Sequence, residues 1–324
     1  MSRMTYAEAS AAALAEEMRR DPTVWCLGED LGRGGVFGQY RGLVDEFGPD
    51  RVADTPISEA TIMGAAVGAA LVGTRPVVEM RFSDFALCAV DELVNQAAKA
   101  RFMFGGQARV PMVVREPIGM WRSSAAQHSQ SLEAWYVHVP GLIVVAPATP
   151  ADNKGLLKAA IRTDDPVVYM EHKDLWPLEG EVGDEADAVL PLGQARIARE
   201  GGDVTLVAWS RMVGEAEAAA EAAAAKGIAA EVVDLRTLWP WDEATVLASV
   251  AKTGRLLIVH EAVQVGGFGA EIAATVAEQA AGALKAPVRR LGAPRAPISY
   301  AKPLEDSLRV TPEAIVAAVE RLAG

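Results

Sequence analysis

The residues best suited to chemistry in this sequence are a glutamate at the start of a predicted helix and a histidine in a polar loop. Glu59 follows Ser58, which can cap a helix predicted over 58–72. An acid in the first turn is favoured by the helix dipole alone, so a function for Glu59 requires a ligand beside it. His128 lies in the polar run 125–130, beyond a predicted strand, where parallel sheets place their sites. Both residue types can transfer protons.

The glycine-rich and metal-ligand motifs that the sequence could contain give little support to other kinds of site. The Gly266-Gly267-Phe268-Gly269 loop lies between a predicted strand and helix, as in dinucleotide sites, but its spacing differs from G-x-G-x-x-G. An NAD-binding oxidoreductase is therefore a remote alternative. The sequence contains no G-x-x-x-x-G-K-[ST] and no G-x-S-x-G motif. We predict no metal site, because no histidine or cysteine pair has ligand spacing. The remaining histidines and the two cysteines are His138, His172, His260, Cys26 and Cys88.

Composition limits the class of protein. The 324 residues are enough for about two domains, and 51% of them are hydrophobic. The net charge of −12, from 31 Lys and Arg against 43 Asp and Glu, argues against nucleic acid or an anionic membrane as a partner. Two cysteines cannot form a disulfide framework, and no apolar stretch approaches the roughly 20 residues of a membrane helix. We expect a soluble, cytoplasmic globular protein.

The first half of the chain alternates two kinds of segment. Short β-branched apolar runs are typical of buried parallel strands, and longer Ala-rich segments have helical periodicity. Thr5 and Glu8 form a predicted capping box at the first helix. The alternation predicts an α/β domain over 1–176, with a parallel sheet flanked by helices. The predicted strands are 24–27, 76–80, 110–114, 142–146 and 167–170, and the predicted helices are 5–20, 58–72, 84–104 and 150–162.

The second half repeats this alternation after an acidic, turn-rich stretch. We interpret 177–198 as a linker and 199–324 as a smaller α/β domain. Gly227 is expected to end the Ala-rich helix before it. The predicted strands are 204–209, 229–235, 255–260 and 288–291, and the predicted helices are 213–226, 242–251, 269–284 and 312–322.

A series of short motifs carries a family resemblance over nearly the whole chain. They are Leu27-Gly28-Glu29-Asp30, Asp54-Thr55-Pro56-Ile57-Ser58-Glu59, Gly64-Ala65-Ala66-Val67-Gly68, Ala126-Gln127-His128-Ser129-Gln130, His138-Val139-Pro140-Gly141-Leu142, Asp234-Leu235-Arg236-Thr237-Leu238 and Gly266-Gly267-Phe268-Gly269-Ala270-Glu271. In this order they are specific, unlike any one alone. The chain resembles the β subunit of the thiamine-diphosphate-dependent, decarboxylating first component of 2-oxo acid dehydrogenase complexes.

This resemblance implies a two-domain, transketolase-like fold: a pyrimidine-binding domain and a smaller C-terminal domain. It also implies an α2β2 heterotetramer with an α subunit, and association with a lipoyl-bearing acyltransferase core. In the family, the α chain holds the cofactor's diphosphate and Mg²⁺ through a G-D-G…N motif. That motif is absent here, because Gly201-Gly202-Asp203 does not match it. The chain alone is therefore expected to be catalytically incomplete.

The resemblance also assigns roles to residues. Glu59 would hydrogen-bond a ring nitrogen of the aminopyrimidine and so favour the imino tautomer, which takes the thiazolium proton. We expect the Glu59 carboxylate to be buried, because burial would keep its proton affinity high enough to share that proton. His128 would lie near the reacting centre and assist proton transfer or acylation of the lipoyl group. Phe85 and Ile57 would pack near the pyrimidine. Glu29 would be an acid near the cofactor.

The sequence departs from the family pattern at three places. Arg81 replaces an uncharged residue beside the pyrimidine; it could pair with Glu59 or Glu29, or bind a substrate carboxylate. The loop Met120-Trp121-Arg122-Ser123-Ser124 is bulkier than usual, so the family pattern does not predict the substrate pocket. Some relatives bind potassium in the segment matching Ala160 to Asp165, and two residues of that segment differ here.

The sequence therefore predicts oxidative decarboxylation of a 2-oxo acid with acyl transfer to lipoyl. Pyruvate is favoured over branched-chain acids, because the 125–130 run lacks an aromatic residue. Acetoin dehydrogenase is the closest alternative, but Arg81 and Arg122 favour an anionic substrate. An alternative from another functional class is a non-catalytic subunit that only assembles the lipoyl-bearing complex.

Overall fold

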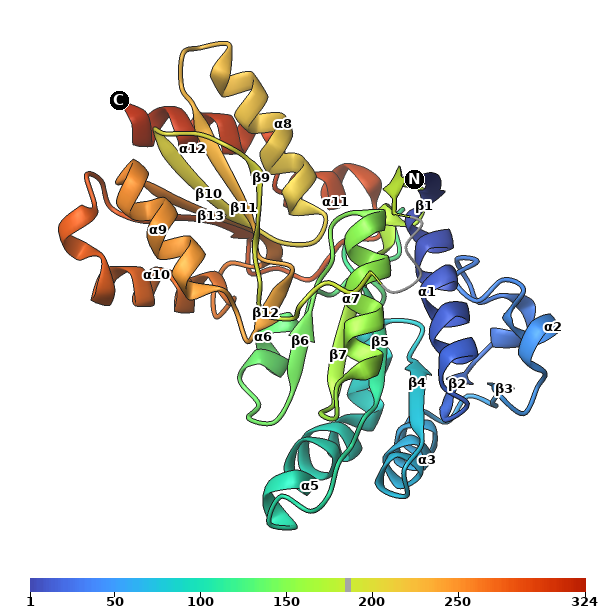
Figure 1. Ribbon diagram of the computed structural model, residues 1–324. Helices are drawn as coiled ribbons and strands as arrows, with labels where there is room; N and C mark the ends of the chain where they lie inside the picture. Colours follow the sequence, from blue (N-terminus) through green and yellow to red (C-terminus); the bar gives the residue numbers. More distant parts are fainter. Residues whose placement is uncertain (184–187) are drawn as a thin grey trace. The chain divides into compact units, whose positions relative to one another are not determined.

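The computed structural model describes residues 1–183 and 188–324, which form two compact units (Figure 1). Unit 1 comprises 1–118 and the described part of 135–192, and unit 2 comprises 119–134 and 193–324. The segment 119–134, which we expected in the first domain, thus belongs to the second unit. The predicted linker 177–198 contains the strand β8 (Glu179–Val182) and most of β9 (Arg196–Arg199). It also includes residues 184–187, which lie outside the described residues.

Unit 1 is built on six parallel strands; the apolar runs predicted five of them, and the short strand at 52–54 was not predicted. Neighbouring strands are joined by helical crossovers, so every carboxyl end of a strand lies at the same edge of the sheet. In spatial order the strands are β6 (Ile143–Val145), β7 (Val167–His172), β5 (Val113–Ile118), β4 (Arg75–Glu79), β2 (Val24–Gly28) and β3 (Val52–Asp54). A separate antiparallel pair, which alternation did not predict, joins β1 (Ser2–Thr5) to β8 (Glu179–Val182).

Helices α1 (Tyr6–Arg20) and α7 (Pro150–Arg162) lie side by side over one face of this sheet (Figure 1). The predicted capping box is confirmed: the Thr5 hydroxyl accepts from the Glu8 N–H, and the Glu8 carboxylate accepts from the Thr5 N–H at 2.8 Å. Apolar side chains of both helices pack with the strand residues that face them. This cluster includes Leu14, Met18, Leu156, Leu157, Val77 and Val113.

Helix α3 (Glu59–Leu71) packs against β4 and β2. The segment 83–103 is helical, but the prediction of one continuous helix over 84–104 is wrong. Its hydrogen bonds change register, because η3 (Glu92–Ala97) is a wider, π-helical turn. Periodicity in the sequence reports which face is buried and does not report this register. The other pieces are α4 (Ser83–Ala86), η2 (Leu87–Ala89) and α5 (Ala98–Met103).

Unit 2 contains a five-stranded sheet in the order β14-β13-β10-β11-β9. Four strands are parallel, as predicted, and the edge strand β9 is antiparallel to β11. The strands are β9 (Arg196–Arg199), β10 (Val204–Ala208), β11 (Ala230–Asp234), β13 (Leu256–Val263) and β14 (Arg289–Ala293). The helices are α8 (Met212–Ala224), α9 (Glu243–Thr253), α10 (Gly269–Gln279), η5 (Ala281–Ala283), α11 (Lys302–Leu308) and α12 (Pro312–Ala323).

A few short elements complete the described chain: η1 (Leu31–Arg33), α2 (Leu43–Phe47), α6 (Glu133–Val137), η4 (Lys173–Leu175) and β12 (Thr237–Trp239). None of the helices within 1–183 and 188–324 has the length and apolar character needed to cross a membrane.

Candidate functional site

Three neighbouring strands of unit 1 deliver charged residues to one edge of the sheet. Glu29 follows β2, Glu59 begins the helix after β3, and Arg81 follows β4. The strands pair in parallel in the order β4-β2-β3, so their carboxyl ends meet there. The structure thus brings together three of the residues that the sequence singled out.

Arg81 is held by carboxylates on both sides of its guanidinium group. Its Nη1 atom pairs with Asp30 Oδ2 and lies 3.7 Å from Glu29 Oε2. Arg81 and Asp30 both adopt left-handed backbone conformations, with φ of +55° and +59°. Such strain in residues other than glycine persists where the surroundings enforce it and is concentrated at functional sites. Of the two glutamates considered as its partner, Arg81 contacts Glu29.

The charges at this edge act on the pKa of Glu29. Burial raises the pKa of the Glu29 carboxyl, and the charge of Glu59 raises it further, whereas Arg81 lowers it. Glu29 and Glu59 therefore form an interacting pair of carboxylates, with one cation beside them.

Glu59 is half-buried at the first turn of α3, and not fully buried as we expected. Ser58 occupies the cap position, but its Oγ donates to the Ile57 carbonyl at 2.6 Å, so the predicted side-chain cap is wrong. Ile57 exposes 76% of its surface next to the carboxylate. Phe85 is half-buried and packs edge-on against Phe82, with ring centroids 5.4 Å apart.

A buried ionic layer lies behind this edge, and sequence reasoning missed it. Arg115 is fully buried and donates from Nε and Nη2 to both oxygens of Glu171 at 2.7 Å. Its guanidinium lies 4.9 Å from the centre of the Tyr40 ring. Glu79 is 3% exposed, and burial raises its pKa to about 7, although Arg115 opposes the shift. Glu79 Oε1 also accepts from the Arg81 N–H at 3.1 Å. The sequence signal that could have revealed this layer is a charged residue inside each of three largely apolar strands: Glu79, Arg115 and Glu171.

A second buried carboxyl lies under α4. Glu116 accepts from Ser83 Oγ at 2.8 Å, and burial raises its pKa to about 8. This residue also stands inside an apolar strand, β5, directly after Arg115.

His128 belongs to unit 2, whereas Glu59 belongs to unit 1. It lies in a loop whose ends meet, because the Gly119 N–H donates to the Gln130 carbonyl at 3.2 Å. Its own N–H donates to the Ala125 carbonyl at 3.4 Å, and the residue is half-buried.

Arginine contacts the segment 160–165, which we considered as a potassium site from the resemblance. Arg75 Nη1 donates to the carbonyls of Ile161 and Thr163 at 3.1 and 2.8 Å, and Nη2 donates to Asp164 at 2.7 Å. A guanidinium therefore already satisfies backbone carbonyls there. Among the described residues, no group of His, Cys, Asp and Glu has an arrangement that could hold a metal ion.

The glycine loop of unit 2 packs around a histidine. A Cβ atom added to Gly267 or Gly269 would lie 2.7 or 3.0 Å from the His260 ring. His260 stacks on Trp209 at 5.2 Å, and burial lowers its pKa to about 4. These glycines are required by close packing, which accounts for the motif without a nucleotide.

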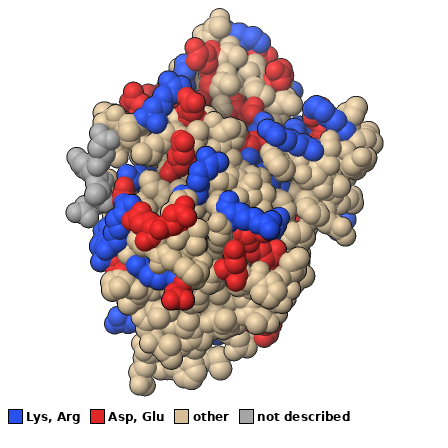
Figure 2. Space-filling model, turned by 90° about the vertical axis from the view of Figure 1, so that its right-hand side faces the viewer, with Lys and Arg blue, Asp and Glu red and all other residues tan. Residues whose placement is uncertain are grey.

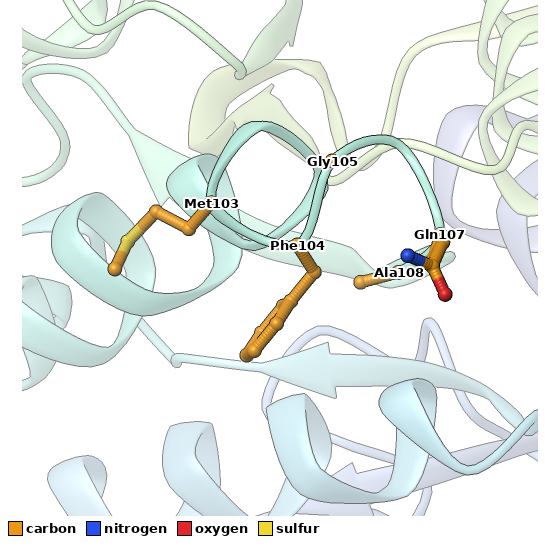
Figure 3. Close-up of a pocket in the computed structure, with 5 residues that line it drawn as sticks. All are labelled: Met103, Phe104, Gly105, Gln107 and Ala108. Atoms are coloured by element: carbon orange, nitrogen blue, oxygen red, sulfur yellow. The ribbon is translucent and has the colours of Figure 1, made fainter.

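The end of α5 carries a cavity of about 570 Å³ lined by Met103, Phe104, Gly105, Gln107 and Ala108. In Figure 3 the side chains of Met103, Phe104 and Gln107 project away from one another around the turn. None of the five lining residues is titratable, so this cavity offers no acid–base chemistry.

Comparison with known families matches both halves of the chain. Residues 2–179 match the transketolase pyrimidine-binding domain, and residues 193–315 match the transketolase C-terminal domain. A β subunit of a solved split-gene transketolase, described as an inactive β4 tetramer, superposes with a TM-score of 0.80 at 25% identity, covering 99% of this chain and 98% of that one.

Curated relatives are similar over nearly their full length. The chain is 47% identical to the β-2 subunit of the mitochondrial pyruvate dehydrogenase E1 component of Oryza sativa subsp. japonica, covering 98% of this chain and 86% of the relative. It is 48% identical to the β subunit of acetoin:2,6-dichlorophenolindophenol oxidoreductase of Cupriavidus necator, covering 95% and 94%. It is 44% identical to the 2-oxoisovalerate dehydrogenase β subunit of Bacillus subtilis, covering 100% and 99%. The chain therefore belongs to the transketolase-like family of β subunits of 2-oxo acid and acetoin dehydrogenases.

Proposed function

We propose that this chain is the cofactor-activating subunit of a thiamine-diphosphate-dependent 2-oxo acid dehydrogenase. It acts with an α subunit in an α2β2 heterotetramer in the cytoplasm. The complex decarboxylates pyruvate or a related 2-oxo acid and passes the acyl group to a lipoyl-bearing acyltransferase core. On the face that Figure 2 shows, acidic and basic side chains are interspersed, which suits a protein partner better than nucleic acid.

The observation that carries this proposal is the Glu59 carboxylate at the edge formed by three parallel strands. An aminopyrimidine ring needs one proton-sharing group and apolar surface. Glu59 and exposed Ile57 supply these side by side, and Phe85 adds an aromatic ring in the same unit, so the residues fit the cofactor. Thiamine diphosphate supplies a carbanion nucleophile and an electron sink when bound. Glu59 holds the proton at the ring nitrogen, and Glu29 and Arg81 lie at the same edge of the sheet.

His128, on the loop at 119–134, is proposed as the second proton-transfer residue. Arg81 is engaged by Asp30 and Glu29, so it is not the group that binds a substrate carboxylate. Arg122 is exposed in the same loop as His128, and its guanidinium lies 5.3 Å from the Trp121 ring centre. We assign the recognition of an anionic substrate to Arg122, which favours a 2-oxo acid over uncharged acetoin.

Acetoin remains the second candidate substrate, because the chain is 48% identical to the Cupriavidus necator protein, compared with 47% and 44% for the other two relatives described above. Steady-state assays of the assembled complex with pyruvate, 2-oxoisovalerate and acetoin distinguish the candidates by kcat/KM. Replacing Arg122 by Met should raise KM for a 2-oxo acid and leave KM for acetoin unchanged.

The decisive test is Glu59→Gln in the complex co-expressed with its α subunit. Removing the shared proton should lower kcat by about 100-fold or more, in the range of general acid–base contributions. Glu271→Gln, a first-turn glutamate of α10 that is exposed, is the matched control and should leave kcat unchanged. A Glu59→Gln complex that assembles normally and turns over at the wild-type rate would refute the assignment.

The split of the site between two subunits is tested by calorimetry. Thiamine diphosphate with Mg²⁺ is titrated into the purified, folded chain and into the complex. We expect binding only in the complex, since the diphosphate and Mg²⁺ are assigned to the α subunit. Tight binding to this chain alone would contradict the split-site proposal.

A further inference from the structure

The loop that carries His128 has a strained backbone. Arg122, Ser123 and Ala125 adopt φ of +45°, +58° and +66°, a region that residues with a Cβ rarely occupy. Within the loop, the Ser124 N–H donates to the Trp121 carbonyl at 2.9 Å. Conformations of this kind persist only where surrounding groups enforce them.

Two buried carboxylates of unit 2 bind the backbone of this loop. Glu261, on β13, accepts from the Met120 N–H at 2.7 Å. Glu305, on α11, accepts from the Ser123 N–H at 2.5 Å. Their side chains are only 6% and 3% exposed. Charge-assisted bonds from backbone N–H groups to buried carboxylates are among the stronger hydrogen bonds in proteins.

An arginine completes the clamp from the other side. Arg309 Nη2 donates to the Met120 carbonyl at 2.8 Å and to Glu305 Oε1 at 2.6 Å, and Arg309 Nη1 lies 4.0 Å from Glu261 Oε2. Arg309 therefore bridges both carboxylates and neutralises part of their charge. Met120 is held through both its N–H and its carbonyl, and its residue is 2% exposed.

The far end of the segment is also fixed within unit 2. Trp209 Nε1, at the end of β10, donates to Glu133 Oε1 at 3.0 Å, and both residues are buried. The loop is thus held on both sides of His128, by the clamp at 120–123 and by Trp209 at 133.

We propose that Glu305, Arg309 and Glu261 are positioning residues that hold the His128 loop in its strained, productive conformation. This inference rests on the proposed role of His128. The three side chains bind backbone atoms of the loop, so they act through its geometry. Loosening the clamp should therefore slow proton transfer at His128, whereas cofactor binding at Glu59 in unit 1 should stay unchanged.

The test combines activity with a measurement that is independent of it. Glu305→Ala is compared with Asp306→Ala, a matched control on the same helix whose ion pair with Lys302 is exposed and does not contact the loop. In the co-expressed complex, Glu305→Ala should lower kcat by about tenfold or more, a size typical of misplaced catalytic groups. The calorimetric Kd for thiamine diphosphate should stay within twofold.

The independent measurement is limited trypsin cleavage of the full chain after Arg122, which is exposed, followed by mass spectrometry. Cleavage there should accelerate in Glu305→Ala and not in Asp306→Ala. Glu305→Gln keeps an acceptor for the Ser123 N–H and should retain most of kcat. If the Ala variant does not fold, a folded Glu305→Gln complex that loses tenfold or more in kcat would contradict the proposal. Unchanged cleavage, or turnover within twofold of wild type in a folded Glu305→Ala complex, would overturn the proposal.

The two proposals fail in different ways. A wild-type complex that turns over no 2-oxo acid or acetoin contradicts the proposed function. The cleavage rates of the Glu305 and Asp306 variants would still decide whether the clamp holds the loop.

Discussion

Replacing Glu79 by Gln should make the stability of unit 1 less dependent on pH. Burial raises the pKa of this carboxyl from 4.5 to about 7. Between these values the folded chain keeps a proton that the unfolded chain has released. The stabilisation from the protonated form is therefore complete below about pH 4.5 and is lost as the pH rises through about 7. Gln is neutral throughout and does not show this loss.

The size of the effect follows from the two pKa values. At about 1.4 kcal/mol per pKa unit, the difference between 4.5 and about 7 corresponds to about 3 kcal/mol in the free energy of unfolding. The variant should thus gain about 3 kcal/mol relative to wild type between pH 4.5 and pH 8. The comparison is direct because Glu79 is 3% exposed, so solvent screens it little.

Urea denaturation at a series of pH values measures this difference. Tyrosine and tryptophan fluorescence reports unfolding of the wild type and the variant under identical conditions. Glu278→Gln, on the exposed side of α10 in unit 2, is the control and should show no such trend. A constant free-energy difference between Glu79→Gln and wild type from pH 4.5 to pH 8 would refute the reasoning.

Three further substitutions test the packing and charges of unit 1. Gly141→Ala should destabilise the fold by about 3 kcal/mol or more in urea denaturation, because φ is +101° and the new Cβ would lie 1.9 Å from the Ala98 carbonyl oxygen. Arg115→Met should cost about 3–5 kcal/mol in the same assay, because it leaves Glu171 charged and buried, and a neutral result would contradict the assigned ion pair. Arg81→Ala should raise the pKa of Glu29, because it removes the guanidinium that lowers this pKa. Carbon-detected NMR of labelled glutamate measures the pKa, and a fall would contradict the geometry.

Local signals in the sequence predicted local structure well. The Thr5–Glu8 capping box is confirmed, and the helix predicted over 150–162 has the same bounds in the structure. In both cases a cap and its partner lie within one turn, so the sequence contains the whole interaction. The side-chain cap at Ser58 failed because its hydroxyl bonds to the preceding carbonyl. The hydrogen-bond register of η3 could not be read from periodicity.

The sequence selected candidate site residues but not the contacts between them. The family resemblance selected Glu59, Glu29 and Arg81, and the parallel strand order places them at one edge. The clamp could not be predicted, because Ser123 and Glu305 are 182 residues apart and only the fold brings them together. The roles assigned to these residues remain predictions that the variants above test.

Unit 2 is built from two separate segments of the chain, 119–134 and 193–324, and this affects the order in which the protein folds during synthesis. The segment 119–134 leaves the ribosome before β6 and β7 complete the first sheet. Its partners Glu261 and Arg309 are translated only much later. Until then the His128 loop lacks the bonds of the clamp to Met120 and Ser123, although most of unit 1 can already fold. We expect a nascent chain released before α11 to keep a protease-sensitive loop at 119–134, because Glu305 and Arg309 are then missing.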